Sequence, residues 1–378
     1  MLTPAFTQKL LRQHAPAQAA EVRAVRPRAL DSSASILANL TAGRTAQPVG
    51  LFGLDAELRT AGTGWRTERL VLKAKPPGRA ICQMLTGLAQ ACGGELAEVY
   101  PTFELRTGFA DTHWRELAVY APPAPGAAPA PLLPTVWATH ADEPAARYLL
   151  LLEDLSQHEL LNSAPRPDRW TDAHLRAALR QLAAWHARHL VPAAAAPPAG
   201  PAPWPELLPL WEALLANAAT RLPTLYPPAR VRQLRGLLGT AATDWATVQQ
   251  LPKTLIHNDL NPRNTCFERR PDGALRFVAY DWELATWHLP QYDVVELLSF
   301  VLRPARYQQR AAYLELYRQE LDALTGQFAD RAAFAEGYRL AALEFGLHRL
   351  GLYGMAHSLS PYPFLPGVID SYFDGLAA

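Results

Sequence analysis

The sequence predicts an α+β fold with two lobes, a small β-rich amino-terminal lobe and a larger, mainly helical carboxy-terminal lobe. Strand-like apolar runs, bounded by proline and glycine, gather in the first 153 residues. Apolar residues at helical spacing dominate the remainder, where one compact group of strand-like segments interrupts them at 254–287. We therefore expect domains at residues 1–153 and 154–378, with ligands bound in the cleft between them.

The strands of the amino-terminal lobe are predicted from apolar runs and from the prolines and glycines that end them. The run 67–75 is closed by Pro76 and Pro77, and proline is rare inside strands. A helical start precedes the strands. The expected strands are 35–42, 48–58, 67–75, 134–139 and 147–153, and the expected helices of this lobe are 79–92 and about 108–121.

The carboxy-terminal lobe is predicted as a series of helices around the small β group. Thr171 stands where the N-cap of the first helix belongs, because its hydroxyl can accept a hydrogen bond from the first turn. Two proline- and alanine-rich stretches, 122–134 and 192–203, are expected to be surface connectors, since proline cannot continue a helix. The expected helices are 168–190, 205–223, 228–248, 291–301, 304–325 and 330–352.

Composition excludes several classes of protein. The 378 residues carry 36 basic and 35 acidic side chains, a net charge of +1, which argues against a nucleic-acid partner. No apolar run reaches the roughly 18 residues of a membrane span, and the amino terminus lacks the apolar core of a secretory signal. The three cysteines form no CxxC pair, as is usual in a reducing compartment. We expect a cytoplasmic protein with no membrane partner; the sequence does not predict its oligomeric state.

The polar loop 257–264, which lies between two apolar runs, is the strongest chemical signal. It holds His257, Asp259 and Asn264, and the next apolar run ends at Asp281. Magnesium prefers oxygen ligands and usually takes one or two carboxylates together with phosphate oxygens. Asn264 and Asp281 can supply such ligands from one end of the β group, which leaves Asp259 free to accept a proton from an attacking hydroxyl.

The segment His257-Asn258-Asp259, with Asn264 and then Asp281 before a tryptophan, resembles the catalytic loop and metal-binding aspartate of the protein-kinase-like fold. In detail it resembles the aminoglycoside phosphotransferase/choline kinase family of small-molecule kinases, whose loop reads H-x-D-x-x-x-x-N and whose metal aspartate precedes Trp or Phe. The resemblance covers roughly residues 35–300 and implies a bilobal kinase-like fold. It departs at Asn258, where the family often has glycine.

The resemblance also implies an ATP site in the amino-terminal lobe. Lys73 matches the lysine that contacts the α- and β-phosphates, and Glu116 matches its helical ion-pair partner. Glu153 and Leu155 match the joint whose backbone holds adenine. Gly43 is the one glycine of the segment that matches the phosphate-covering loop, so the usual glycine-rich pattern is absent there.

The resemblance implies transfer of the ATP γ-phosphoryl group to a hydroxyl of a small molecule, with Mg²⁺ held by Asn264 and Asp281. Asp259 is the implied base, and His257 is grouped with the catalytic residues as the side chain that braces the loop. Two alternatives stay open. One is a nucleotide-binding pseudokinase that acts as a scaffold. The other is a protein kinase, which is disfavoured because a helical pattern begins about ten residues after Asp281 and leaves no room for an activation segment.

Several residues near these motifs keep two interpretations. Lys75 lies on the same strand face as the preferred Lys73. Glu283 is a metal ligand, a supporting carboxylate or a substrate contact, and Asp293 is expected to cap the helix that follows it. His186, three residues from a second histidine, has a metal-binding spacing, but a structural role is favoured because no further ligands are in register.

The acceptor is the part of the function that the sequence leaves open. Aminoglycoside-, choline- and sugar-like alcohols are all candidates: a pocket for the first should be rich in carboxylates and a pocket for the second rich in aromatic side chains. The acceptor side is expected in the helices after residue 155, where Glu344, His348 and Arg349 are ionisable candidates.

Overall fold

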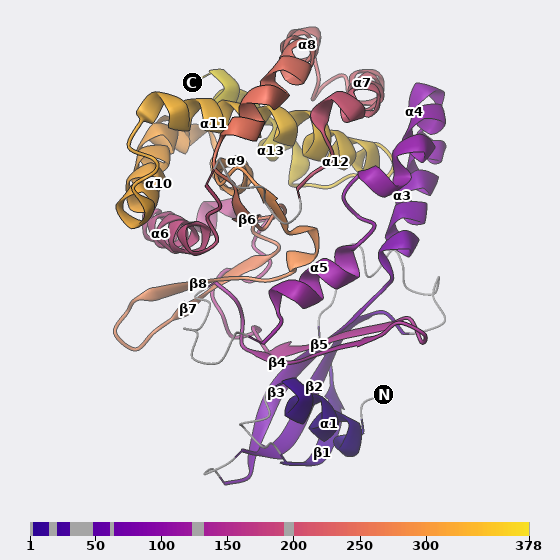
Figure 1. The fold of residues 1–378 in the computed structure, drawn as a ribbon, viewed down its shortest axis with the longest axis vertical. Coiled ribbons are helices and arrows are strands. Elements are labelled where there is room, and N and C mark those ends of the chain that lie inside the picture. The colour runs from indigo at the N-terminus through magenta and orange to yellow at the C-terminus, as the bar shows by residue number, and fades with distance from the viewer. Residues whose placement is uncertain are drawn as a thin grey trace.

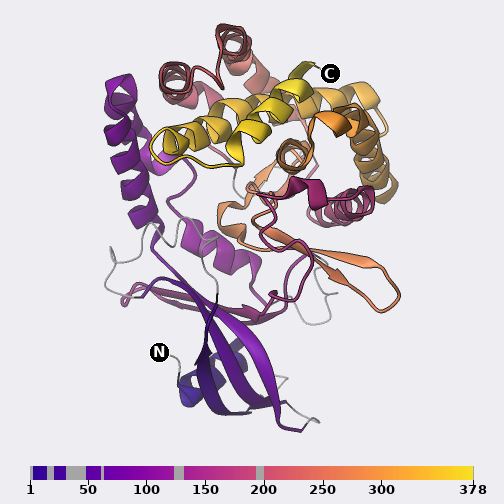
Figure 2. The ribbon, with the colours of Figure 1, turned by 180° about the vertical axis from the view of Figure 1, so that it is seen from behind.

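A computed structural model describes the chain at residues 3–14, 21–30, 48–60, 64–122, 132–192 and 200–377. The expected strand 35–42 and Gly43 lie outside these residues. Figures 1 and 2 show a sheet at one end of the molecule and a larger body of helices at the other, with the amino terminus beside the sheet and the carboxy terminus among the helices. The α+β arrangement predicted from the sequence is therefore confirmed, while the domain boundary at residues 153 and 154 stays a prediction.

The amino-terminal sheet has five antiparallel strands in the order β1-β2-β3-β5-β4, with helix α1 (Pro4–His14) packed against it. β3 lies at the centre, where Lys73 is paired with Leu51 of β2 and Leu150 of β5. Because side chains alternate along a strand, Lys73 and Lys75 point to the same face. The strands are β1 (Glu21–Arg28), β2 (Gly50–Arg59), β3 (Arg66–Lys75), β4 (Val136–Asp142) and β5 (Arg147–Glu153).

The edge strand β1 was not predicted. Its sequence, EVRAVRPR, carries three arginines and a proline, and only Val22 in it is buried. Charged side chains and proline are tolerated on an edge strand because one side of the strand needs no hydrogen-bond partner. The strand-like pattern is therefore weak, and it is pairing with β2 that keeps these residues extended.

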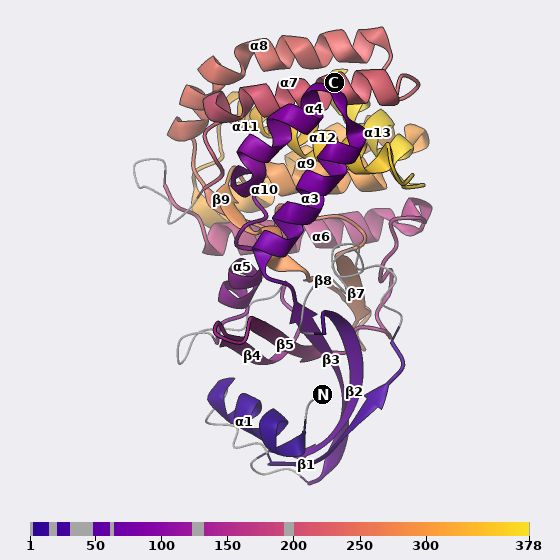
Figure 3. The same cartoon turned by 90° about the vertical axis from the view of Figure 1, so that its right-hand side faces the viewer.

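The described residues between β3 and β4 form three α-helices, α3 (Gly78–Cys92), α4 (Gly94–Val99) and α5 (Thr112–Val119), with a 3₁₀ helix at Tyr100–Arg106 before α5. Gly78 begins α3 where a Cβ atom would lie 1.9 Å from the carbonyl oxygen of Ala110, so only glycine permits this approach. In Figure 3 α3 rises from the sheet toward the helical body, and its buried side chains share one hydrophobic core with the helices there. This arrangement places the apolar face of α3 beside the second half of the chain.

The helical body confirms most of the predicted helices. The expected helix 304–325 begins with a short 3₁₀ segment, and the expected helix 330–352 is divided by a π-helical turn at Phe345–Arg349. Thr171 caps α6 as expected, since its hydroxyl accepts a hydrogen bond from the N–H of His174. The last helix, α13, was not predicted. The helices of this body are α6 (Asp172–Arg188), α7 (Trp204–Arg221), α8 (Pro228–Gln250), α9 (Gln291–Val301), α10 (Arg310–Thr325), α11 (Arg331–Glu344), α12 (Leu350–His357) and α13 (Leu365–Ala377).

The small β group consists of two antiparallel pairs, and it positions the polar loop. β6 (Thr254–Ile256) pairs with β9 (Thr286–His288), and β7 (Thr265–Arg269) pairs with β8 (Leu275–Ala279). Because β7 begins opposite the end of β8, the loop before β7 and the residues after β8 meet at one end. Among the described residues, no helix is long and apolar enough to cross a membrane.

Candidate active site

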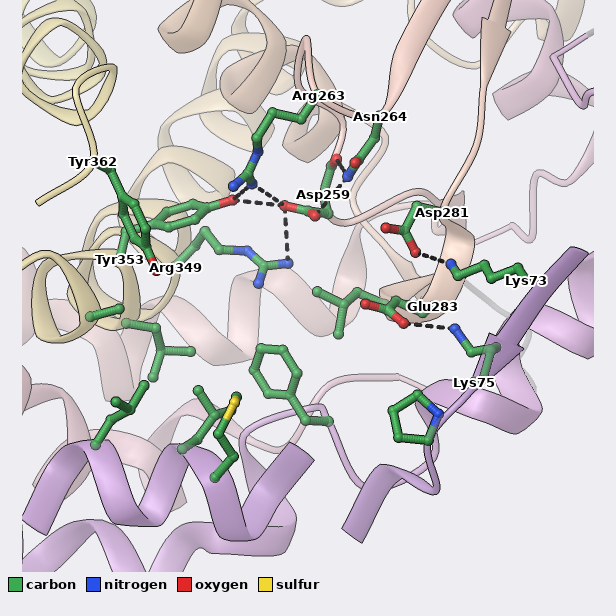
Figure 4. A pocket seen from close by; sticks show the side chains of 18 of the residues that line it. Lys73, Lys75, Asp259, Arg263, Asn264, Asp281, Glu283, Arg349, Tyr353 and Tyr362 are labelled. Atoms are coloured by element: carbon green, nitrogen blue, oxygen red, sulfur yellow. Dashed lines mark hydrogen bonds and ion pairs between the residues drawn. The ribbon is translucent and has the colours of Figure 1, made fainter. Parts of the chain in front are cut away.

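A buried group of charges links the central strand, helix α5 and the residues that follow β8. Lys73 Nζ lies 2.8 Å and 2.7 Å from the two carboxylate oxygens of Glu116. The same nitrogen lies 2.5 Å from Asp281 Oδ1, a contact that Figure 4 shows. The Lys73 side chain is 11% exposed, and the Glu116 side chain is completely buried. Residues predicted for phosphate, ion-pair and metal contacts are thus brought together, although Asp281 is 208 residues from Lys73 along the chain.

The charges in this group shift one another's pKa values. Burial alone would lower the pKa of Lys73, but Asp281, Glu116 and Glu283 together outweigh it and raise that pKa well above its usual value. Burial likewise works to raise the pKa of Asp281, yet the neighbouring Lys73 and Lys75 lower it to about 2. Lys73 is therefore a cation and Asp281 an anion at neutral pH, as phosphate and metal contacts require.

A second lysine completes the group. Lys75 is completely buried, donates a hydrogen bond to Glu116, and lies 2.7 Å from Glu283 Oε2. Carboxylate oxygens of Glu116, Asp281 and Glu283 all lie within 4.8 Å of one another. Since Glu116 and Glu283 are held by lysines and nearly buried, Asp281, with its side chain 23% exposed, is the carboxylate of this set that best reaches open space.

Asn264 and Asp281 are joined at the end of the β7–β8 pair. The N–H of Tyr280 donates to the carbonyl oxygen of Asn264 at 2.9 Å, which sets the two loops side by side. Both side chains line the same two cavities and offer an amide and a carboxylate oxygen. Such a pair of oxygen donors suits magnesium when phosphate oxygens complete the ligand set.

Asp259 lies in the loop beside Asn264 and is surrounded by hydrogen-bond donors. Its Oδ2 accepts from Asn264 Nδ2 at 2.7 Å, and its Oδ1 accepts from Asn261 Nδ2 at 3.0 Å and from Tyr353 Oη at 2.9 Å. The guanidinium groups of Arg263 and Arg349 lie 3.8 Å and 4.0 Å from the same Oδ1. The carboxylate is therefore fixed in one orientation at the wall of a cavity (Figure 4).

The loop that carries Asp259 is anchored by buried neighbours on both sides. His257 is fully buried, and its Nε2 lies 2.9 Å from the carbonyl oxygen of Tyr280, while its ring packs on Trp282 with centroids 4.5 Å apart. This geometry links the loop to the segment that carries Asp281. His257 therefore braces the loop through its contacts with Tyr280 and Trp282.

Asp293 has a role that sequence reasoning missed. It lies inside helix α9 instead of capping it, and its carboxylate accepts hydrogen bonds from the backbone N–H groups of His257 at 2.8 Å and Asn258 at 2.9 Å. His186, 3.2 Å from the same carboxylate and 2.5 Å from Tyr317 Oη, is structural as favoured from the sequence. The available signal was a charged residue in a mainly apolar helix, a composition that indicates burial.

The departure at Asn258 has a conformational explanation. Asn258 has φ of +61°, in the left-handed region, where glycine has no steric penalty and asparagine is the commonest other choice. Its side-chain Nδ2 also donates to the carbonyl oxygen of Leu284 at 3.0 Å. Asparagine thus adopts a left-handed turn that glycine would also allow, and its side chain adds a hydrogen bond to the segment after Asp281.

Two cavities meet at the charged group. One is lined by apolar side chains from the sheet and the segment after β5, among them Val71, Leu152 and Leu155. The other lies between the loop, α3 and α12, and includes Asp259. Both are lined by the same four residues where they adjoin: Lys73, Arg263, Asn264 and Asp281.

The joint after β5 borders the first cavity. Glu153 is the last residue of β5, and its carboxylate accepts a hydrogen bond from the N–H of Thr135 at 2.7 Å. The next residue, Asp154, pairs with Arg28 of β1 at 2.6 Å. These contacts hold the joint so that Glu153 and Leu155 line the cavity.

Comparison with solved structures finds distant similarity along nearly the whole chain. An ethanolamine kinase of Plasmodium vivax is 8% identical with a TM-score of 0.44, over 94% of this chain and 82% of that chain. An aminoglycoside 2'-phosphotransferase in its GDP complex is 10% identical with a TM-score of 0.41, over 99% and 100%. A microcompartment-associated aminopropanol kinase is 14% identical with a TM-score of 0.42, over 97% and 98%.

A search of curated proteins finds no match to the chain. A comparison with family models does find one. The model of the phosphotransferase enzyme family, APH, matches residues 63–327, which is more than half of the chain and includes Lys73, Asp259 and Asp281. The family resemblance inferred from the sequence is confirmed: the protein belongs to the phosphotransferase enzyme family.

Proposed function

We propose that the protein transfers the γ-phosphoryl group of ATP to a hydroxyl group of a small molecule. The observation that carries the proposal is the meeting of two cavities at Lys73, Asn264 and Asp281, with Asp259 lining one of them only. A nucleotide in the first cavity would direct its terminal phosphate to the junction. An alcohol in the second would then face that phosphate beside Asp259.

In the first cavity, apolar side chains such as Val71 and Leu152 would enclose the adenine, next to the backbone of Glu153 and Leu155. Lys73, oriented by its ion pair with Glu116, would bind the α- and β-phosphates. The contribution of this half of the site is to hold the triphosphate in one position, which supplies much of the rate acceleration in phosphoryl transfer.

Magnesium, held by the side-chain oxygens of Asn264 and Asp281, would neutralise charge on the phosphates. The protein's own contribution at this point is the fixed pair of donors at the β7–β8 end and the ammonium of Lys73 beside them. Glu283, which pairs with Lys75, would support Asp281 from behind as a positioning residue and not as a ligand.

Asp259 would orient the acceptor hydroxyl and take its proton. The acceptor oxygen forms a bond to the γ-phosphorus, the bond between that phosphorus and the β,γ-bridging oxygen breaks, and ADP leaves with the electron pair. The hydroxyl proton passes to Asp259 and then to water. Hydrogen bonds from Asn264 and Tyr353 support this role because they fix the carboxylate at the cavity wall.

The proposal is tested by an ATP-consumption screen over alcohols of several classes, with mass spectrometry to detect the gain of one phosphate. With the acceptor that reacts, Asp259→Asn should lower kcat by about 100-fold or more, since a general base contributes about that much. Asp272→Asn, in the exposed β7–β8 turn, is the matched control and should react as the native protein does. Near-native turnover of the Asp259→Asn variant would contradict the base assignment.

The same screen separates the alternatives. Magnesium-dependent nucleotide binding with no phosphorylated product would favour a scaffold. Phosphorylated protein without a phosphorylated small molecule would favour a protein kinase. Against the latter, α9 begins at Gln291, so only nine residues lie between it and Asp281, too few for a long activation segment.

A further inference from the structure

The wall of the acceptor cavity that faces Asp259 is apolar. Met84, Leu85 and Leu88 of α3 line it together with Phe109, and Leu352 of α12 extends the same surface. Figure 4 shows a group of unlabelled apolar side chains across the cavity from Asp259 and Arg349. The cavity is partly open to solvent, and its apolar wall suits a small molecule with an apolar portion.

The wall that carries Asp259 is basic. Arg263 and Arg349 both approach Asp259, and both are largely buried, with side chains 11% and 8% exposed. Arg263 donates to Tyr353 Oη at 2.6 Å and to Asn261 Oδ1 at 3.1 Å. Within the described part of the chain Arg349 makes one hydrogen bond, from Nη2 to the backbone oxygen of Asn258, and its Nε is buried without a partner; the donors left for a ligand are those of the terminal nitrogens.

Besides Asp259, the carboxylates that line this cavity already form ion pairs within the protein. Asp281 and Glu283 are paired with lysines. Glu296, buried behind Asp259, has its pKa raised to about 8, first by burial and then by the charge of Asp259, so it is neutral at pH 7. Two guanidinium groups therefore surround one acceptor-side carboxylate, and a ligand with several positive charges would be repelled.

The adjoining cavity, reached past Leu284 and Arg349, offers no unpaired carboxylate from the described residues either. Arg115 and Arg106, which pairs with Glu206 at 2.8 Å, line it together with His348, whose pKa is lowered by burial. Its one lining carboxylate among the described residues, Glu344, is bound by His288 at 2.6 Å and by the indole of Trp204 at 2.8 Å. This extension therefore adds no free negative charge for a polyamine ligand.

We propose, on the basis of the phosphotransferase function above, that the acceptor is an apolar hydroxy acid. Its hydroxyl would lie at Asp259, its carboxylate at Arg349, and its apolar body against α3. Because the Arg349 guanidinium lies only 4.0 Å from Asp259 Oδ1, the hydroxyl and the carboxylate must be close neighbours, as in α- and β-hydroxy acids. An aminoglycoside or an amino alcohol lacks the anion and carries the wrong charge.

The test compares three probes of equal length: β-hydroxydecanoate, β-hydroxydecanamide and the corresponding β-hydroxy amine, with kanamycin as a polycation. Phosphorylated product is quantified by mass spectrometry with ATP and Mg²⁺. The carboxylate should exceed the amide in kcat/KM by about tenfold or more, as one charge-assisted hydrogen bond provides, and the amine and kanamycin should be poorest. Equal rates, or a preference for the amine or kanamycin, would overturn the proposal.

Variants at Arg349 examine the same contact. Arg349→Met should abolish the preference for carboxylate over amide, whereas Arg349→Lys, which keeps the charge, should retain part of it. Arg176→Gln, at an exposed arginine of α6, is the matched control and should keep the full preference. Thermal unfolding of each variant establishes that the fold survives. An unchanged preference in folded Arg349→Met would overturn the assignment of the anion to this residue.

Binding separates this inference from the proposed function. Calorimetric titration of each probe into the protein with ADP and Mg²⁺ requires no turnover. If the carboxylate binds most tightly but gains no phosphate, the hydroxy-acid site stands and phosphoryl transfer fails. If another alcohol is phosphorylated while the carboxylate binds no better than the amide, transfer stands and the hydroxy-acid site is wrong.

Discussion

Lys75 and Glu283 form an almost completely buried ion pair, 2.7 Å long, beside the more exposed Lys73–Asp281 pair. The two lysines are two residues apart on β3, and the two acids are two residues apart after β8. Two ion pairs side by side therefore join the sheet to residues 281–283. Glu116 contacts both lysines and links the two pairs.

Removing Lys75 should destabilise the protein strongly. Lys75→Met leaves Glu283 buried without its cation, and losing one partner of a buried pair typically costs about 3–5 kcal/mol. Lys75→Met/Glu283→Gln should recover part of this loss, because no unpaired charge then remains at Glu283. Urea unfolding measures both, with Lys9→Met on the exposed face of α1 as control. Equal stability of the single variant and the control would show that the pair contributes little.

Asp293 should behave as a positioning residue. Asp293→Ala removes the acceptor of two backbone N–H groups in the loop that carries Asp259, and each unsatisfied buried donor costs about 1–3 kcal/mol. We expect lower stability and a lower kcat with the KM for ATP little changed, since the cavity proposed for the nucleotide does not include this contact. Steady-state kinetics and urea unfolding test this. A rise in the KM for ATP with native kcat is the contrary result.

Asn258 should tolerate glycine but not valine. Its φ of +61° suits glycine, so Asn258→Gly loses only the hydrogen bond to Leu284, about 1 kcal/mol. Asn258→Val places a β-branched residue in the left-handed backbone region. The strain costs roughly 1–2 kcal/mol in addition to that loss. Thermal unfolding should rank native, glycine and valine proteins in that order. A valine variant as stable as the glycine variant would be inconsistent with the backbone conformation.

Glu296 should make stability fall as the pH rises. Its pKa is raised to about 8 in the folded protein, first by burial and then by Asp259, with Arg349, Asp293 and Arg263 as the other charged neighbours; in an unfolded chain it is about 4.3. The folded state binds more protons between these values, so the contribution is present at low pH and lost as the pH rises through about 8.

Glu296→Gln cannot ionise and should remove this dependence. Urea unfolding at pH 5 and at pH 8.5 should show the variant gaining at least about 1 kcal/mol relative to the native protein as the pH rises. The conservative shape of glutamine preserves the packing of α9. A stability difference that stays constant between the two pH values would mean that Glu296 has an ordinary pKa.

The sequence by itself determined most helices, the central strands and the residues of the phosphotransferase pattern. These features are local: helical periodicity, strands closed by proline, and His257, Asp259 and Asn264 within one short loop. Even Asn258 follows from a local need, a left-handed backbone turn. The α+β class and the family could therefore be predicted before any contact was known.

Only the tertiary structure decided which side chains support those residues. Asp293 holds the loop from 35 and 36 residues away, Lys75 reaches Glu283 across 208 residues, and Arg349 approaches Asp259 from the end of a π-helical turn. β1 is held extended by its antiparallel pairing with β2. Such contacts depend on how distant segments pack and on which buried charges must be compensated, and neither is encoded in the spacing of neighbouring residues.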